Sequence, residues 1–279
     1  ETAVLYRDND SALPLIDLLE RAGTPYRCRQ VESAFFTSRV VRDVTDVIRF
    51  ALDPWDGERF LRLYYKLGAG ISRSLAQEAA DRADRERETI LAYIGRQPGA
   101  SPWTRRQCAA LSTHLSNLLQ ERGDRAVYRI VHFMGYGAYL EEHGMDGSRA
   151  DILEAIGANQ PTPLALLERL EELEQVVRAG AHGGEEVPFL LSTIHSSKGL
   201  GYGRVILMDV ADGIFPKTVP EGPEPEQAEL DAYEEERRLF YVGMTRAKNE
   251  LSIVRFRKEG LSSLFAEELF PTPREPRPN

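Results

Sequence analysis

Polar residues gather where a strongly apolar segment ends. The apolar run over residues 189–194 passes into a polar loop that contains Thr193, His195, Ser196, Lys198 and Gly199. Such runs are typical of buried parallel strands, and open α/β sheets bind ligands beyond the carboxyl ends of their strands. Hydroxyls, an imidazole, an ammonium group and free backbone N–H groups suit a phosphate. The segment is therefore a candidate phosphate site; the alternative interpretation is an ordinary polar turn with a surface histidine.

Arg246 is the second candidate. A helix is expected over residues 232–247, and on it Leu239, Val242 and Arg246 share one side, while Gly243 lets a neighbouring element approach closely. An arginine projected from a packed helix is what an arginine finger requires, because its guanidinium matches phosphate oxygens as a fork. The alternative interpretation is that Arg246 pairs with a carboxylate of the same fold.

A phosphate cradle is missing from this sequence. Its five lysines are Lys66, Lys198, Lys217, Lys248 and Lys258, and none of them lies in a G-x-x-x-x-G-K-[ST] pattern. That pattern holds the triphosphate and supplies the hydroxyl that binds Mg²⁺. We therefore expect no ATP hydrolysis by this chain alone.

The elements that must position these residues follow an interrupted α/β pattern. Strands are expected over residues 3–7, 26–29, 189–194, 205–210 and 251–256. A helix is expected over 38–52, and further helices over 73–94, 102–122, 125–142, 149–156 and 163–178. Residues 179–186 resemble a flexible linker and residues 271–279 a disordered, proline-rich tail. The fold class is therefore α/β, a sheet domain interrupted by an all-helical insertion.

Composition narrows the functional class. The chain has 279 residues, a net charge of −9 and two cysteines, so a disulfide scaffold is excluded and a reducing, cytoplasmic compartment is expected. No apolar run is long enough for a membrane span. The start without methionine suggests a piece of a longer protein. Eight acidic residues and no basic residue lie within residues 221–236, so the rest of the chain is nearly neutral and nucleic acid remains a possible partner.

Three segments together resemble the carboxyl-terminal half of UvrD/Rep-type superfamily 1 DNA helicases. Ala-Val-Leu-Tyr-Arg at 3–7 is similar to the start of that half, Thr-Ile-His-Ser-Ser-Lys-Gly-Leu at 193–200 to motif V, and Glu-Glu-Arg-Arg-Leu-Phe-Tyr-Val-Gly-Met-Thr-Arg-Ala at 235–247 to motif VI. The resemblance implies a RecA-like parallel-sheet domain, 2A, over residues 1–65 and 187–270. Residues 66–186 correspond by position to the helical insertion, domain 2B.

The resemblance also implies roles for single residues. Arg246 matches the arginine that reaches the γ-phosphate of ATP, which makes it the expected catalytic and ATP-binding residue. Thr193 and His195 match positions close to single-stranded DNA, and Ser196 and Lys198 belong to the same DNA-binding loop. In the insertion, Gly68 and Gly70 resemble a glycine turn that contacts duplex DNA.

Gly201 departs from the family pattern. The family usually has a glutamate there that binds the ribose of the nucleotide, and glycine has no side chain to accept that hydrogen bond. Gly201 is thus an ATP-site position at which ribose recognition is in doubt.

The resemblance implies part of an ATP-dependent 3′-to-5′ DNA helicase. ATP and Mg²⁺ would be the cofactors of the full-length parent, and the partners would be single-stranded and forked DNA and an upstream RecA-like domain, 1A. No membrane is expected as a partner. Two alternatives stay open: a subunit of a helicase–nuclease, and a non-catalytic DNA-clamp or protein-interaction module.

Overall fold

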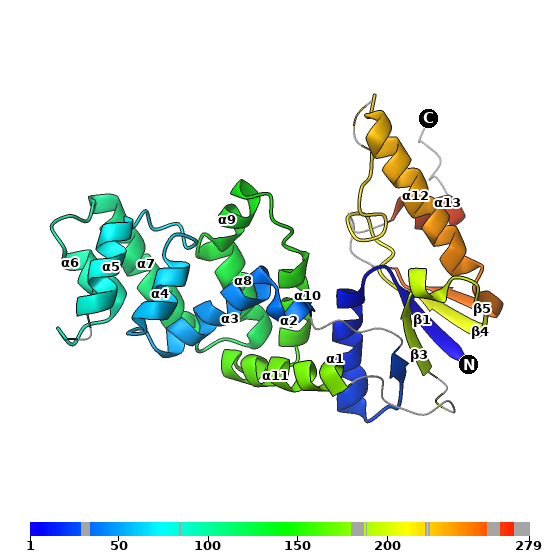
Figure 1. Ribbon diagram of the computed structural model, residues 1–279, viewed down its shortest axis with the longest axis horizontal. Helices are drawn as coiled ribbons and strands as arrows, with labels where there is room; N and C mark the ends of the chain where they lie inside the picture. Colours follow the sequence, from blue (N-terminus) through cyan, green and yellow to red (C-terminus); the bar gives the residue numbers. More distant parts are fainter. Residues whose placement is uncertain are drawn as a thin grey trace, which may run out of the picture. The chain divides into compact units, whose positions relative to one another are not determined.

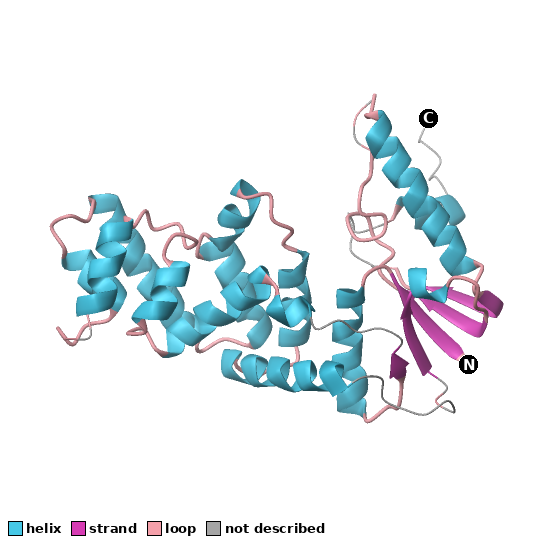
Figure 2. Ribbon diagram, in the orientation of Figure 1, coloured by secondary structure: helices cyan, strands magenta, loops and turns pink. Residues whose placement is uncertain are grey.

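The computed structural model describes residues 1–28, 34–83, 85–179, 187, 189–220, 222, 224–255 and 263–270. The chain divides into two compact units: Glu1–Glu32 with Ala179–Asn279, and Ser33–Arg178. We call the first the sheet unit and the second the helical unit, because the described strands all lie in the first (Figures 1 and 2). The expected linker beyond residue 179 and the expected tail over 271–279 lie outside the described residues.

The sheet unit is built on five parallel strands. In sheet order they are β2 (Arg27–Cys28), β3 (Phe189–Thr193), β1 (Thr2–Tyr6), β4 (Tyr202–Leu207) and β5 (Ala247–Ile253). The central strand β1 pairs with β3 and β4, in a register that sets Tyr6 opposite Thr193 and Leu5 opposite Leu207. β1 and β3 are buried over almost their whole length, which explains their continuous apolar sequences. The α/β class with a parallel sheet is confirmed, an arrangement consistent with a RecA-like domain.

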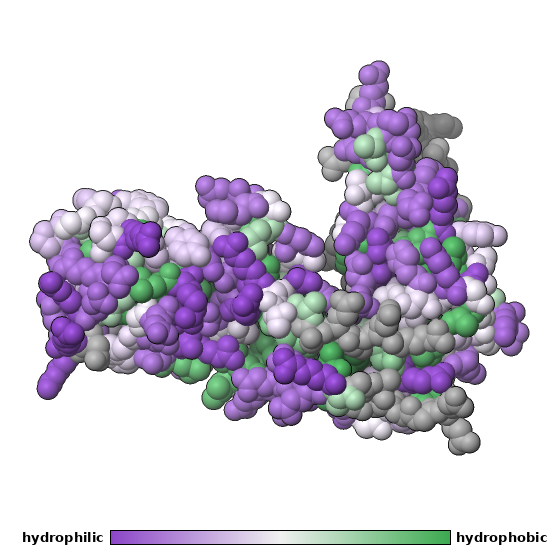
Figure 3. Space-filling view, viewed as in Figure 1, coloured by the Kyte–Doolittle hydropathy of each residue, from purple (hydrophilic) through white to green (hydrophobic). Residues whose placement is uncertain are grey.

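Helices complete the sheet unit. They are η1 (Asn9–Ser11), α1 (Ala12–Ala22), η2 (His195–Ser197), α12 (Gln227–Met244) and α13 (Leu264–Leu269). α12 packs against β4 and β5. The buried rings of Phe215, Phe240 and Phe265 form an aromatic cluster between α12, α13 and the chain after β4. Residues over α12 are largely hydrophilic in the space-filling view (Figure 3), as expected for a helix rich in acidic side chains.

The end of α12 and the start of β5 differ from the sequence prediction. α12 ends at Met244 rather than at residue 247, and β5 begins at Ala247 rather than at residue 251. The reason is the ladder with β4, in which Tyr202 pairs with Ala247 and the Tyr202 N–H donates to the Arg246 carbonyl at 2.8 Å. Polar residues 248–250 of this edge strand are exposed, so their sequence carries no apolar strand signal.

Helices alone make up the described part of the helical unit. They are α2 (Ala34–Thr37), α3 (Arg39–Leu52), α4 (Gly57–Leu63), α5 (Arg73–Arg82), α6 (Ile90–Arg96), α7 (Pro102–Leu118), α8 (Gly123–Phe133), α9 (Tyr136–Glu142), α10 (Ser148–Gly157) and α11 (Pro163–Ala179). α3 packs against α4, α7, α8 and α10. The expected boundary between residues 65 and 66 is therefore corrected to a division near residue 33, because α3 and α4 pack within the helical unit.

Two of the predicted helices are each interrupted. The segment 73–94 forms α5 and α6, and the segment 125–142 forms α8 and α9 with Gly135 between them. Gly135 has a φ of 86°, and a Cβ on it would lie 3.0 Å from the Leu67 carbonyl carbon and 3.2 Å from the Gly68 α-carbon. The turn at Gly135 and the turn at Gly68 thus touch through backbone, which only glycine permits there.

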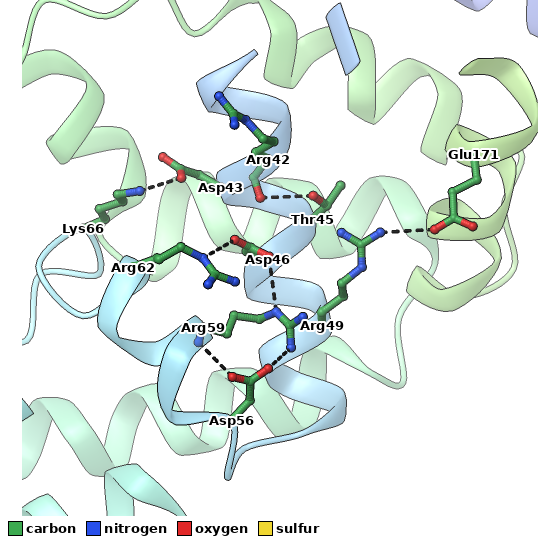
Figure 4. A network of polar contacts seen from close by, with 10 residues as sticks. All are labelled: Arg42, Asp43, Thr45, Asp46, Arg49, Asp56, Arg59, Arg62, Lys66 and Glu171. Atoms are coloured by element: carbon green, nitrogen blue, oxygen red, sulfur yellow. Dashed lines mark hydrogen bonds and ion pairs between the residues drawn. The ribbon is translucent and has the colours of Figure 1, made fainter. Parts of the chain in front are cut away.

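A buried carboxylate joins these two turns. Asp43 on α3 accepts from the Lys66 Nζ at 2.5 Å and from the Tyr136 hydroxyl at 3.1 Å, and Lys66 and Asp43 are both almost fully buried. Figure 4 shows the ion pair and, one turn further along α3, Asp46 bound by Arg59 and Arg62. Lys66 lies two residues before Gly68 and Tyr136 directly follows Gly135, so Asp43 holds both turns to one helix.

We expect Lys66→Met to lower the free energy of unfolding of the helical unit by about 3–5 kcal/mol, because it leaves Asp43 buried without its counter-charge. Urea unfolding followed by tryptophan fluorescence measures this unit alone, since Trp55 and Trp103 both lie in it. The matched control is Arg178→Met, which removes an exposed pair with Glu174 and costs less than about 1 kcal/mol. Equal losses in the two variants would show that the buried pair is unimportant.

Candidate nucleotide and nucleic-acid site

The carboxyl ends of three strands converge in the sheet unit. Arg7 follows β1, His195 comes two residues after β3, and Asp209 comes two residues after β4. The Arg7 N–H donates to the Asp209 carboxylate at 3.2 Å, and Asp209 has a φ of 65°, a conformation that aspartate tolerates better than most residues. Burial raises the pKa of Asp209. This edge is where ligands of open parallel sheets bind.

Arg7 is tied to α12. Its Nε lies 3.1 Å from both Glu236 carboxylate oxygens and its Nη2 lies 2.6 Å from Oε1, while Nη1 donates to Asp8 at 3.0 Å. The Arg7 and Glu236 side chains are 17% and 12% exposed, so the pair is largely shielded from water. The hydrogen bonds from Glu236 raise the pKa of Arg7. Sequence reasoning gave neither residue a role; the one signal available was an arginine directly after a buried apolar strand.

The loop after β3 is held by its own hydroxyls. Thr193 Oγ1 donates to the Ser196 hydroxyl at 2.9 Å and accepts from the Ser196 N–H at 3.1 Å. Ser197 is fully buried and donates to the Ile194 carbonyl at 2.7 Å. His195 and Lys198 are exposed. The predicted site residues are thus together in one loop, with Thr193 and Ser196 holding its shape while His195 and Lys198 face outward.

His195 lies in a positive environment. Its pKa is lowered, first by partial burial and then by the charges of Arg7 and Lys198, against a smaller opposing effect of Glu236 and Asp8. A neutral imidazole beside two cations can still donate or accept a hydrogen bond, and the cations attract a phosphate.

Arg246 lies directly beyond the carboxyl end of α12 rather than on the helix. Its Nε donates to the Val242 carbonyl at 2.9 Å, Nη1 to the Leu200 carbonyl at 2.9 Å and Nη2 to the Thr245 hydroxyl at 3.1 Å. A cation beside the last carbonyls of a helix is favourable. Gly243 permits the tight seat of α12, since a Cβ there would lie 3.0 Å from Leu207 Cδ2.

The Arg246 charge has no counter-ion in the part of the chain that the structure describes. No carboxylate lies within ion-pair distance of it there, so the carboxylate-pair interpretation finds no support among those residues. Its three hydrogen bonds use three of the five guanidinium N–H groups. Two N–H groups remain for an anionic ligand.

Lys248 covers the position where the ribose-binding acid was expected. A Cβ on Gly201 would lie 2.8 Å from Lys248 Cε and 3.7 Å from its Nζ. Residues 200 and 201 thus have two cationic neighbours, Arg246 and Lys248. The local charge favours an anion, and the residue that sequence reasoning missed here is Lys248.

Gly68 and Gly70 form a separate feature of the helical unit. Both are exposed and have φ values near 60°, while Leu67, Ala69 and Ile71 between and beside them are buried. The apolar residues anchor the turn, so only the backbone at the two glycines faces outward. Such a backbone can approach a phosphate closely.

Comparison with known proteins gives a consistent picture. The family model of the UvrD-like helicase C-terminal domain matches residues 124–258. The putative ATP-dependent DNA helicase YjcD of Bacillus subtilis is 26% identical over 89% of this chain and 33% of its own length. ATP-dependent DNA helicase Rep of Salmonella typhimurium is 25% identical over 90% of this chain and 39% of its own length. ATP-dependent DNA helicase PcrA of Bacillus subtilis is 24% identical, with 90% and 36% covered.

This chain therefore spans between a third and two fifths of the length of these relatives, and the match falls in their carboxyl-terminal part. Within the described residues, no helix combines the length and the apolar character that crossing a membrane demands.

We expect an NMR titration of the imidazole to give His195 a pKa below its ordinary value, and Arg7→Met to raise it. Removing Arg7 takes away one cation and leaves the Glu236 carboxylate unpaired, and both changes favour the protonated ring. Because the folded-state pKa is lowered, this histidine makes the chain more stable as pH rises through the range between its folded and unfolded pKa values. Arg204→Met, which removes an exposed arginine paired with Glu250, is the control. An unchanged His195 pKa in Arg7→Met would contradict the assignment of its electrostatic neighbours.

Proposed function

We propose that this chain, a homologue of the carboxyl-terminal part of UvrD-, Rep- and PcrA-type helicases, is the arginine-finger and DNA-coupling half of an ATP-dependent 3′-to-5′ DNA helicase. In this proposal the sheet unit is the RecA-like domain 2A and the helical unit is the inserted domain 2B. The observation that carries it is Arg246: a guanidinium held by two backbone carbonyls, without a counter-ion in the described residues and with two N–H groups to spare.

ATP would lie between this chain and an upstream RecA-like domain, 1A, which would supply the triphosphate cradle. Mg²⁺, when bound there, neutralises charge on the phosphates. The donor set on this side fits such a ligand, because Arg246 and Lys248 bring two cations close to residues 200–201. Arg246 would stabilise the negative charge that develops on the γ-phosphoryl group, where a pre-positioned guanidinium acts most strongly.

The contact between Arg246 and Leu200 supports coupling of ATP to DNA. Leu200 closes the loop that begins at Thr193, and its carbonyl holds Arg246 at 2.9 Å. A movement of Arg246 toward a nucleotide would therefore pull on the loop that carries His195 and Lys198. In the proposal these two residues contact the backbone of single-stranded DNA, while Thr193 and Ser196 keep the loop in shape.

Gly68 and Gly70 would contact the duplex ahead of the single strand, so that a fork is the DNA substrate of the whole protein. Cytoplasmic location is part of the same proposal. One observation favours a second candidate, a non-catalytic DNA clamp: with Gly201 and Lys248, the site lacks a carboxylate for the ribose. ATP turnover by the whole protein separates the two candidates.

In the whole protein, we expect Arg246→Ala to lower the turnover number for ATP about a thousandfold or more, with only a minor loss of ATP binding. The guanidinium is aimed at charge that exists mainly in the transition state, so it contributes little to the ground state. Arg246→Lys keeps the charge but loses the fork, and should recover only part of the rate. Undiminished turnover in Arg246→Ala would contradict the role of this arginine, and a whole protein without turnover would favour the clamp.

The chain of 279 residues alone should show no ATP turnover above background with Mg²⁺ and single-stranded DNA, because none of its lysines lies in a P-loop pattern. Phosphate release by purified chain measures this, with Arg246→Ala as the matched sample. Turnover that co-purifies with the chain and disappears in Arg246→Ala would mean that the chain contains a phosphate cradle of another kind.

A further inference from the structure

Trp103 lies directly on the glycine turn of the helical unit. If Gly70 carried a Cβ, that atom would be 2.4 Å from Trp103 Cζ3 and 3.1 Å from Cε3, so the indole covers one side of the Gly70 α-carbon. The next residue, Thr104, donates its hydroxyl to the Gly70 carbonyl at 3.2 Å. Even so, the Trp103 side chain stays 46% exposed and Gly70 is exposed too. The first turn of α7 and the glycine turn therefore form one outer surface.

This surface is basic within an acidic chain. Residues 59–77 and 89–120 contain no aspartate or glutamate, although the whole chain has a net charge of −9. Three exposed arginines lie at the contact: Arg73 at the start of α5, and Arg105 and Arg106 in the first turns of α7. Trp103 and Arg106 are three residues apart on α7 and so lie on the same side of it.

The three arginines keep their charge unpaired, unlike others nearby. In the described part of the chain no carboxylate lies within ion-pair distance of Arg73, Arg105 or Arg106, and Arg105 donates only to the carbonyls of Ala100 and Gln97. In contrast, Lys66 is paired with Asp43, and Arg59 and Arg62 are paired with Asp46 (Figure 4). The uncompensated positive charge of these segments is thus concentrated around Trp103.

The surface is also pre-organised. The buried carboxylate of Asp43 binds Lys66, two residues before Gly68, and Tyr136, directly after Gly135, whose turn touches Gly68. Little ordering entropy is therefore lost when a ligand binds this turn. An exposed aromatic ring between unpaired arginines and an open glycine backbone matches a sugar–phosphate chain better than a protein surface, because phosphates take the cations and the ring packs on a sugar or base.

We propose that Trp103, Arg73, Arg105 and Arg106 extend the glycine turn into a binding surface for duplex DNA, with the indole packed against the sugar and base edge of the strand whose phosphates contact the arginines. This inference rests on the proposed contact of Gly68 and Gly70 with duplex. It adds a specificity-determining aromatic residue and three phosphate contacts to that turn.

Fluorescence tests the proposal directly, because the chain has only two tryptophans, with almost equal exposure: 46% for Trp103 and 45% for Trp55. Trp55→Phe leaves Trp103 as the only reporter, and Trp103→Phe leaves Trp55, which lies between Asp53 and Asp56. Titration with a short blunt-ended duplex at low salt should quench the first variant saturably and leave the second nearly unchanged. Quenching of Trp55 alone, or of both equally, would overturn the assignment.

Binding measurements on the same chain complete the test. Trp103→Ala should weaken duplex binding about fivefold or more without changing its salt dependence. Arg73→Gln and Arg106→Gln should each lower the slope of log K against log salt by about 1. Trp55→Ala and Arg178→Gln, the latter taken from an exposed pair with Glu174, should bind like the original chain. Circular dichroism confirms that each variant is folded.

The failures are distinguishable. If the original chain binds no duplex even at low salt, both this proposal and the duplex role of the glycine turn fall. If it binds duplex but Trp103→Ala binds equally well and Trp103 is not quenched, only the present proposal falls. A single strand that quenches Trp103 at lower concentration than the duplex overturns the choice of duplex.

Discussion

Parallel pairing of β1 with both β3 and β4 is the constraint on which the sheet unit depends. It joins residues 2–6 to residues 189–193 and 202–207, so segments from opposite ends of the chain finish at one edge. Arg7, His195 and Asp209 become neighbours only through this register. A slip of one residue would turn every side chain of the slipped strand to the other face of the sheet. The helix α12 then returns Glu236 to Arg7, and its carboxyl end places Arg246 beside Leu200.

The two arginines of the sheet unit divide the work between structure and chemistry. Arg7 is held by the Glu236 carboxylate in a shielded pair, so its charge is compensated and it joins β1 to α12. Arg246 is held by neutral carbonyls, which orient the guanidinium without cancelling its charge. The helical unit repeats this division: Lys66 is paired with buried Asp43, while Arg73 and Arg106 stay uncompensated among the described residues. In both units the compensated cation positions a segment, and the uncompensated ones are those we propose for phosphate.

Periodicity in the sequence was enough to predict β1, β3 and the α/β class, because buried parallel strands are continuously apolar, and α3, whose cap at Ser38 accepts from the Val41 N–H. It failed where a partner decides the outcome. β5 begins at Ala247 because β4 pairs with it, although residues 248–250 are polar. The amphipathic pattern of α3 shows that one face is buried but not against which helices, so the division near residue 33 was missed. Pairs such as Arg7 with Glu236 or Lys66 with Asp43 are set by tertiary contacts and leave no local pattern.

The central claim is that Arg246 serves the transition state of phosphoryl transfer, and nucleotide affinity tests it most directly. In the whole protein, dissociation constants are measured for ADP alone and for ADP with aluminium fluoride, which mimics the phosphoryl group in transfer. We predict that Arg246→Ala weakens binding of the aluminium fluoride complex about a hundredfold or more and changes ADP binding little, because the guanidinium acts where charge develops. An equal loss for both ligands, or no loss for either, would contradict the account.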